Sequence, residues 1–147
     1  MSGWHGLLEG EYAARRQILD GLTLEQVTQV LSPQTHSIYA ELYHLELWQR
    51  ILVTRDEDLY ERTWQQDIRY PTQVPTDLQE WTDLVEAFFV GLRQAYEWTA
   101  SQERLDHETD PGSSMADVLR GLAVHNAYHF GKIVALRQVM GLWPASG

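Results

Sequence analysis

Apolar residues recur at helical spacing along most of this 147-residue chain, in four long stretches. No stretch shows the alternation of apolar and polar residues that is typical of a half-buried strand. The four stretches predict helices over about residues 4–22, 36–54, 76–99 and 115–140. Because an amphipathic helix must bury its apolar face against another element, the pattern predicts an all-α fold, a helical bundle. We expect one domain over residues 1–147.

The link between the second and third predicted helices, residues 55–75, is acidic and long. Connections of about two to eight residues are usual between neighbouring helices of a bundle. Pro71 and Pro75 argue against regular structure there, so we expect an irregular crossover. A crossover of this length favours a topology other than a simple up-down-up-down arrangement.

Helix start signals are present at several places. Thr76 followed by Gln79 predicts a capping box at the start of the third helix. Ser113 or Ser114 predicts the cap of the fourth helix, and Thr23 marks the start of a further short helix.

Composition narrows the class of function. The formal charge of −10 disfavours binding to nucleic acid or to an anionic membrane. The lack of cysteine excludes disulfides, thiolate metal sites and a cysteine nucleophile. No apolar run approaches about 18 residues, and the start of the chain lacks the pattern of a signal peptide. We therefore expect a cytoplasmic protein with neither nucleic acid nor a membrane as partner.

Two histidines, His125 and His129, lie four residues apart within the apolar stripe of the fourth predicted helix. Imidazoles at this spacing share one helix face and can chelate one metal ion. The alternative is a pair of core histidines, each with a local hydrogen bond. His44 lies on the inward stripe of the second predicted helix, so facing helices would bring three imidazoles together. Three histidines with vacant positions are typical of a catalytic metal site.

Glu41 lies one turn before His44 and on nearly the same side of the helix. A buried carboxylate there could accept a hydrogen bond from a ligand imidazole, or it could be a solvated residue at the stripe edge. A di-iron site would need further inward carboxylates, and none lies between His125 and His129. Asn126 also replaces the glutamate of an H-E-x-x-H protease motif.

The other histidines have weaker claims to the site. His5 could reach the opening of the predicted metal site, but its position favours a surface residue at a helix start. His36 lies next to the break before the second helix and suits capping or packing, and His107 lies in a polar turn.

Three segments carry a family resemblance, in the same order along the chain: "WHGLL…GLTLEQ", "HSIYAELYHLELWQRIL" and "HNAYHFGKIVALRQ". Together they resemble the DinB family, also called DinB/YfiT-like metalloenzymes. The resemblance implies a DinB-like four-helix bundle with a long crossover between helices 2 and 3, and a homodimer. It also implies that His44, His125 and His129 are the metal ligands. Lys132 departs from the family, which commonly has glutamine there; it either brings a cation to the site or extends to the surface.

The resemblance also implies a type of activity. Family members include low-molecular-weight-thiol S-transferases that use bacillithiol or mycothiol, and metal-dependent hydrolases and isomerases. We therefore expect a divalent metal cofactor, zinc or nickel first and iron or manganese as alternatives. The expected partners are a small-molecule electrophile and a low-molecular-weight thiol. Glu41 and Tyr128 are the candidate catalytic side chains, and Trp48 and Trp64 could line the pocket. A helical dimer without catalysis, with structural histidines, stays open.

Overall fold

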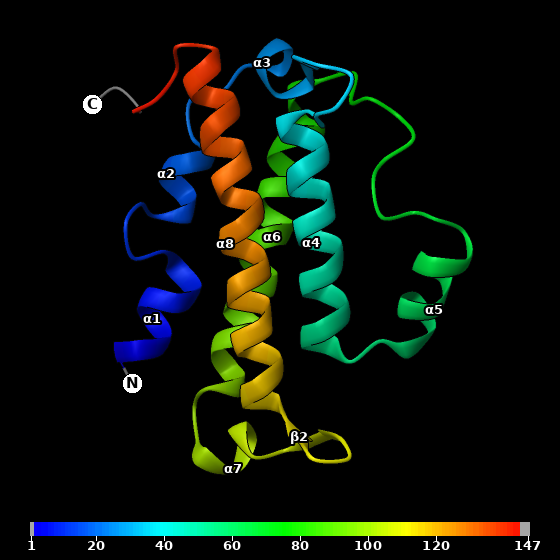
Figure 1. The fold of residues 1–147 in the computed structure, drawn as a ribbon, viewed down its shortest axis with the longest axis vertical. Helices are drawn as coiled ribbons and strands as arrows, with labels where there is room; N and C mark the ends of the chain where they lie inside the picture. The colour runs from blue at the N-terminus through cyan, green and yellow to red at the C-terminus, as the bar shows by residue number, and fades with distance from the viewer. Residues whose placement is uncertain (1, 145–147) are drawn as a thin grey trace.

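Three long helices, α4 (Ile38–Thr54), α6 (Leu78–Trp98) and α8 (Met115–Val139), make up most of the fold (Figure 1). In this computed structural model, which describes residues 2–144, α4 packs against both α6 and α8. The shorter elements are α1 (Ser2–Glu9), α2 (Arg15–Leu19), α3 (Leu24–Thr28), α5 (Glu57–Gln65), α7 (Gln102–Leu105), β1 (Glu108–Asp110) and β2 (Ser113–Ser114). The prediction of a mostly helical fold is confirmed. Among the described residues, no helix combines the length and apolar character needed to cross a bilayer.

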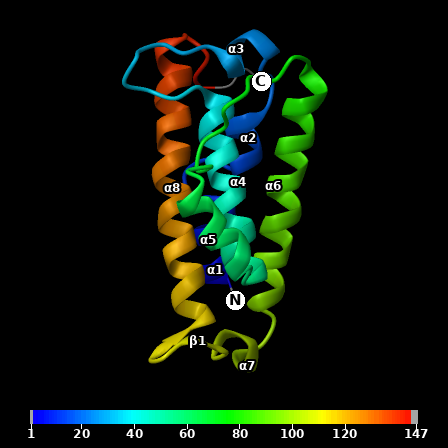
Figure 2. The same ribbon diagram turned by 90° about the vertical axis from the view of Figure 1, so that its right-hand side faces the viewer.

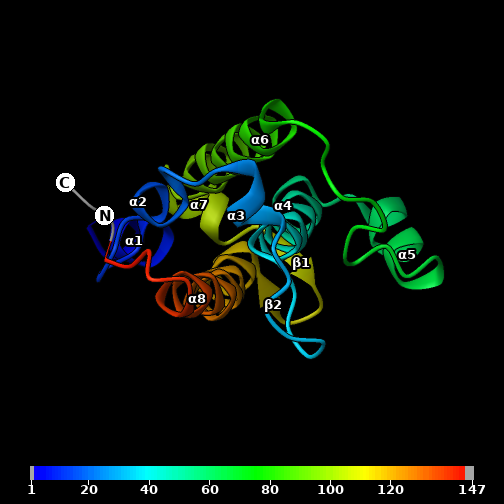
Figure 3. The same ribbon diagram turned by 90° about the horizontal axis from the view of Figure 1, so that it is seen from above.

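The directions of the long helices explain the long crossover. α4 and α6 start at the same end of the molecule and run the same way, whereas α8 runs back (Figures 1 and 2). Because α4 and α6 are parallel, the chain between them must return along the length of the molecule. The returning segment lies outside α4, on the side opposite to α1 and α2 (Figure 3).

The crossover contains a helix, α5, which corrects the expectation of an irregular link. The side chain of Asp56 caps α5 by accepting a hydrogen bond from the backbone N–H of Leu59, at 3.0 Å. Leu59 and Thr63 are buried, so one face of α5 packs against the rest of the molecule. Pro71 and Pro75 lie beyond the end of this helix, and their helix-breaking effect is confined to the later part of the crossover.

The first predicted helix, residues 4–22, is two short helices instead of one. Gly10 has φ of +98°, in the left-handed region, and ends α1 just after Glu9. A side chain at Gly10 would collide with the carbonyl oxygen of Ala13, so the turn requires glycine. α1 and α2 each pack against α8 and together take the place of the single helix that was expected (Figure 1).

The start of α6 lies one residue later than predicted. Its N-cap is Asp77, paired with Glu80 in a capping box, in place of Thr76 with Gln79. The backbone N–H of Thr76 instead donates to the Glu80 carboxylate. The other start signals are confirmed, because Ser114 caps α8 and α3 begins with a capping box. The turn before α8 is a small hairpin of β1 and β2, which the sequence pattern did not indicate.

A buried chain of polar groups crosses the apolar core between the long helices. Asn126 Nδ2 donates to Gln49 Oε1 at 3.2 Å, and Gln49 Nε2 donates to the Phe88 carbonyl oxygen at 2.7 Å. Asn126, which separates the two histidines of α8 in sequence, therefore serves this core network. Gly91 leaves the space that the Gln49 amide occupies.

We expect Gly91→Ala to lower the free energy of unfolding by about 1–3 kcal/mol. The added Cβ would lie 2.7 Å from Gln49 Nε2, which cannot move away without losing its hydrogen bond to the Phe88 carbonyl. Gly121→Ala in α8 is the control, because a Cβ there meets nothing within 4 Å. Alanine also favours a helix over glycine by about 1 kcal/mol, so the control should be neutral or stabilising. Urea denaturation compares the two variants, and equal stabilities would contradict the expectation.

Candidate metal centre

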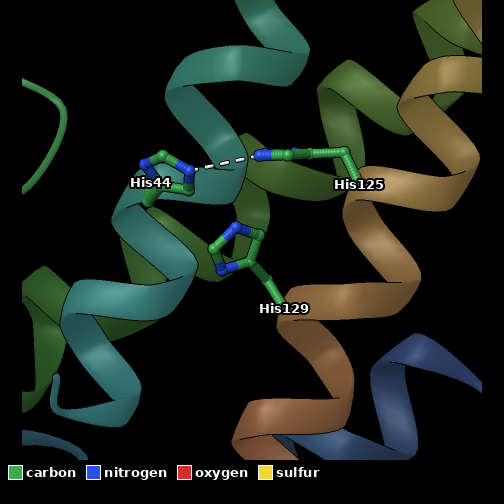
Figure 4. Close-up of side chains that lie close together, drawn as sticks. All are labelled: His44, His125 and His129. Carbon is green, nitrogen blue, oxygen red and sulfur yellow. Dashed lines mark hydrogen bonds between the residues drawn. The ribbon is translucent and has the colours of Figure 1, made fainter. Parts of the chain in front are cut away.

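Three histidine rings converge between α4 and α8 (Figure 4). Ser37 caps α4 and starts the helix so that His44 faces α8. His125 and His129 lie one turn apart on α8 and point towards His44. One ring nitrogen from each residue lies within 4.8 Å of the others, and His44 Nε2 lies 3.1 Å from His125 Nε2. The predicted meeting of the three imidazoles is confirmed.

Hydrogen bonds on the far side of two rings set which nitrogen faces the cluster. His44 Nδ1 lies 3.1 Å from the carbonyl oxygen of Arg69. Because a carbonyl oxygen only accepts, Nδ1 carries the proton and Nε2 keeps its lone pair. His129 Nδ1 lies 2.6 Å from Glu41 Oε2, and donation to that carboxylate leaves the second lone pair on His129 Nε2. Both lone pairs are thereby available to a metal ion.

Burial keeps all three imidazoles neutral at physiological pH. It lowers the pKa of His44, His125 and His129 to about 4, although for His44 the hydrogen bond to the Arg69 carbonyl opposes the fall. For His129 the charge of Lys132 adds to the effect. A neutral imidazole is the form that binds metals. Burial also raises the pKa of Glu41, whereas the charge of Lys132 opposes that rise.

The donor set fits a divalent metal ion. Nitrogen ligands at about 2.0–2.1 Å from one ion are roughly 3.0–3.4 Å apart, a range that includes the separation of His44 Nε2 and His125 Nε2. His125 Nδ1 is buried and has no hydrogen-bond partner among the described residues. The hydrogen bonds of the cluster therefore leave one buried ring nitrogen unpaired within the described part of the chain. Among divalent metals, imidazoles suit zinc, nickel, iron and copper.

The crossover holds His44 in place through two residues that sequence reasoning did not assign to the site. Arg69 supplies the carbonyl oxygen, and the ring of Tyr70 stacks on His44 with centroids 4.5 Å apart. The other face of Tyr70 stacks on His36 at 3.7 Å, so His36 has the packing role that was one of its two expected roles. The presence of aromatic residues within a long crossover was the sequence feature that pointed to this contact. It did not indicate which residues the aromatic rings would pack against.

The two candidate catalytic side chains differ in position. Glu41 is 2 % exposed and is bound to His129. Tyr128 is 63 % exposed, its ring meets His129 edge-on at 5.2 Å, and Lys132 Nζ lies 4.7 Å from its centroid. Lys132 therefore lies at the edge of the site, over Tyr128.

The remaining candidates lie further out. Trp48 meets His44 edge-on at 6.2 Å, and Trp64 packs against Trp48 with centroids 5.7 Å apart. His5 lies 3.3 Å from the hydroxyl of Tyr96 on α6, away from the three clustered rings, and His107 is exposed beside Trp98. Neither His5 nor His107 belongs to the cluster.

Comparisons with protein-family models, curated proteins and solved structures found no match for this chain. The fold and the site therefore define its class by themselves. It is a mostly helical protein with a buried three-histidine cluster that could bind a metal ion.

Glu41→Gln is expected to weaken zinc binding by about 10- to 100-fold. The amide keeps the shape of the side chain but removes the negative charge that makes His129 a stronger ligand. Glu46→Gln on the same helix is the control, because Glu46 pairs with Arg50 at 3.0 Å and not with the cluster. Competition titration against a chromophoric chelator measures both affinities. Equal affinity in Glu41→Gln and the unmodified protein would show that the hydrogen bond does not tune the site.

Proposed function

We propose that the chain is a metal-dependent enzyme of the DinB type, with His44, His125 and His129 as ligands of one zinc or nickel ion. Iron or manganese are the alternatives. One observation carries the proposal: three neutral imidazoles meet in the interior with two lone pairs turned inwards by the Arg69 carbonyl and Glu41. Three protein ligands leave coordination positions for a substrate, as in catalytic zinc sites.

The reaction that we propose is transfer of a low-molecular-weight thiol, of the bacillithiol or mycothiol type, to a small electrophile. A bound divalent ion lowers the pKa of a coordinated thiol or water molecule. The thiol gives its proton to solvent, its sulfur forms a bond to the electrophilic carbon, and the leaving group departs with its electron pair. Glu41 positions His129, and the exposed phenol of Tyr128 donates a hydrogen bond to the incoming substrate.

The environment of Glu41 favours transfer over hydrolysis. A hydrolase needs a base that can reach a water molecule at the site. Glu41 is the nearest candidate, yet it is 2 % exposed and one of its oxygens is already bound to His129 Nδ1. A thiol transferase would depend less on such a base, because an ion held by His44, His125 and His129 would favour the thiolate of a bound thiol more completely than the hydroxide of a bound water molecule.

We also propose the family's architecture for this chain, with one domain over residues 1–147 and assembly as a homodimer. The parallel pair α4 and α6, the antiparallel α8 and the place of α1 and α2 beside α8 support a four-helix bundle (Figures 1 and 3). The crossover then connects the second and third members of that bundle. The molecular mass obtained by sedimentation of the purified protein tests whether it is a dimer.

A structural role for the cluster is the second candidate. The observation that favours it is the low exposure of two ligands, 7 % for His44 and 5 % for His129, which limits access for a substrate. In that case a metal ion would stabilise the fold, and the protein would have no enzymatic activity. Replacing the histidines would then lower the stability of the protein and change nothing else.

Metal content and activity together test the proposal. Elemental analysis of protein purified without an affinity tag should find about one divalent ion per chain. A His44→Ala/His125→Ala/His129→Ala variant should contain none and keep most of its helicity by circular dichroism. A screen of bacillithiol, mycothiol and glutathione with 1-chloro-2,4-dinitrobenzene should then show turnover in the metal-loaded protein only. One ion per chain without turnover against any electrophile would favour the structural role. Failure to bind zinc or nickel after reconstitution would overturn the proposal.

A further inference from the structure

A cavity of about 570 Å³ lies on the face of α8 that is turned away from the histidines. Its walls come from α1, α2 and the segment between them, from α8, and from Trp143 near the end of the chain. On α8, Ala127, Phe130 and Val134 line it, and these residues lie about 100° or more round the helix from His125 and His129. Cavities of about 300–1,000 Å³ with mostly apolar walls are typical of small-molecule sites.

One buried charged side chain, Arg15, lines this apolar cavity; it is only 7 % exposed. Its Nε is buried, and no hydrogen bond or ion pair joins its guanidinium to any of the described residues. The guanidinium carbon lies 4.8 Å from the centroid of Phe130, which gives the cation an aromatic face but no acceptor. Burial without an acceptor lowers the pKa of Arg15, although the charge of Glu9 opposes this.

A second buried arginine, Arg137, shows how a guanidinium with a structural role is hydrogen-bonded in this fold. Arg137 also packs close to α2, and it is 4 % exposed. It donates to the carbonyl oxygens of Ile18 at 2.7 Å, Asp20 at 3.1 Å and Leu142 at 3.2 Å. Arg137 thus ties α8 to the chain around α2. Within the described part of the chain Arg15 has no such partners, so hydrogen bonding to the fold does not explain its burial.

A buried cation without a partner is costly, and a bound anion removes that cost. Among the residues that the structure describes as lining the cavity, Arg15 is the sole cation and Glu11 the sole anion. One guanidinium neutralises one negative charge, and Glu11, which is exposed, repels a second. The planar fork of arginine matches a carboxylate through two parallel hydrogen bonds.

We propose that this cavity binds a monocarboxylate with an apolar body, such as a medium-chain fatty acid, with its carboxylate on Arg15. The chain or ring of the ligand lies along Phe130, Ala127 and Val134, whose burial supplies the apolar part of the affinity. The site is independent of the metal centre, because the two lie on different faces of α8.

Isothermal titration with octanoate, and with octan-1-ol as the neutral analogue, tests the proposal on the full chain. Octanoate should bind one to a chain, and Arg15→Gln should weaken it at least tenfold while leaving octan-1-ol unchanged. Arg16→Gln is the matched control, because Arg16 is exposed, pairs with Glu86 and lies outside the cavity. Equal octanoate affinity in Arg15→Gln and Arg16→Gln, or no octanoate binding at millimolar concentration, would overturn the proposal.

A second variant fills the cavity while keeping Arg15. Gly131 lines the cavity, and a Cβ there meets nothing within 4 Å, so Gly131→Leu is the variant chosen to put an apolar side chain into this space. It should abolish octanoate binding and leave the sedimentation coefficient unchanged. If the unmodified protein fails to bind octanoate and Gly131→Leu instead dissociates a dimer, a second copy of the chain covers this face and the proposal is wrong.

Stability gives a readout that does not depend on any ligand. Arg15→Gln removes a buried, unpaired charge, so its melting temperature should equal or exceed that of the unmodified protein. A marked fall in the melting temperature would show that Arg15 has structural partners, which contradicts the basis of the proposal.

Discussion

His44→Ala is expected to lower zinc affinity by about 100- to 1,000-fold. Structural zinc sites with four ligands bind with about 10–16 kcal/mol, so the loss of one ligand removes roughly 3–4 kcal/mol. His44 is also the member of the cluster that α4 contributes, opposite the two histidines of α8. The two that remain, one turn apart on a single helix, can hold an ion but no longer connect the two helices. Competition titration at pH 7 measures the change.

His36→Ala is the matched control for this prediction. His36 and His44 stack on opposite faces of Tyr70, at 3.7 Å and 4.5 Å, but only His44 belongs to the cluster. A general disturbance of the crossover would affect both variants, whereas loss of a ligand affects His44→Ala alone. Similar losses of zinc affinity in the two variants would show that Tyr70 packing, and not coordination by His44, controls binding.

The metal-free protein is expected to lose several kcal/mol of stability as the pH falls from about 6.5 to 4. Burial lowers the pKa of the three clustered histidines from 6.5 to about 4 in the folded state. Between these values the unfolded chain binds more protons than the folded one, so stability falls as the pH falls. One pKa unit corresponds to about 1.4 kcal/mol, which gives at most about 3 kcal/mol for each of the buried His44 and His129. His125 is more exposed and contributes less, and the raised pKa of Glu41 acts in the opposite direction.

Urea denaturation of protein treated with a chelator, at pH 7, 6, 5 and 4.5, measures this dependence. A His44→Leu/His125→Leu/His129→Leu variant supplies the comparison, because acid also protonates carboxylates elsewhere in both proteins. As the pH falls, the free energy of unfolding of the unmodified protein should decrease relative to that of the variant. Bound zinc should suppress this decrease. A difference that is constant with pH would contradict the neutral, buried state of the cluster.

Much of the site was predictable because its signals are local or nearly so. His125 and His129 are one turn apart, and helical spacing alone puts them on one face. The inward stripe of α4 likewise placed His44 towards the core, where the structure finds it beside α8. For Glu41 the sequence left open a buried and a solvated position, and the structure shows the buried one. Packing two amphipathic helices with their stripes together then brings the imidazoles close, without any detailed knowledge of the loops.

The contacts around the ligands were not predictable in the same way. The hydrogen bond from His44 to the Arg69 carbonyl spans 25 residues, and it depends on the path that the crossover takes outside α4. The stacking of Tyr70 depends on the same path. Asp56 is a clear N-cap for α5. The apolar pattern of this helix is short, however, and the prolines that follow it favoured the prediction of an irregular crossover.

By itself the sequence determined the three long helices, the cap of α8 and the residues that form the three-histidine cluster. These features follow from interactions within about four residues and from the need to bury one face of each helix. Only the tertiary structure decided that α4 and α6 are parallel, that Gly10 divides the first helix and that Glu41 bonds to His129. It also decided that the buried Arg15 Nε has no hydrogen-bond partner among residues 2–144, whereas Arg137 has several. Such outcomes depend on packing between segments far apart in the chain, which no local pattern encodes.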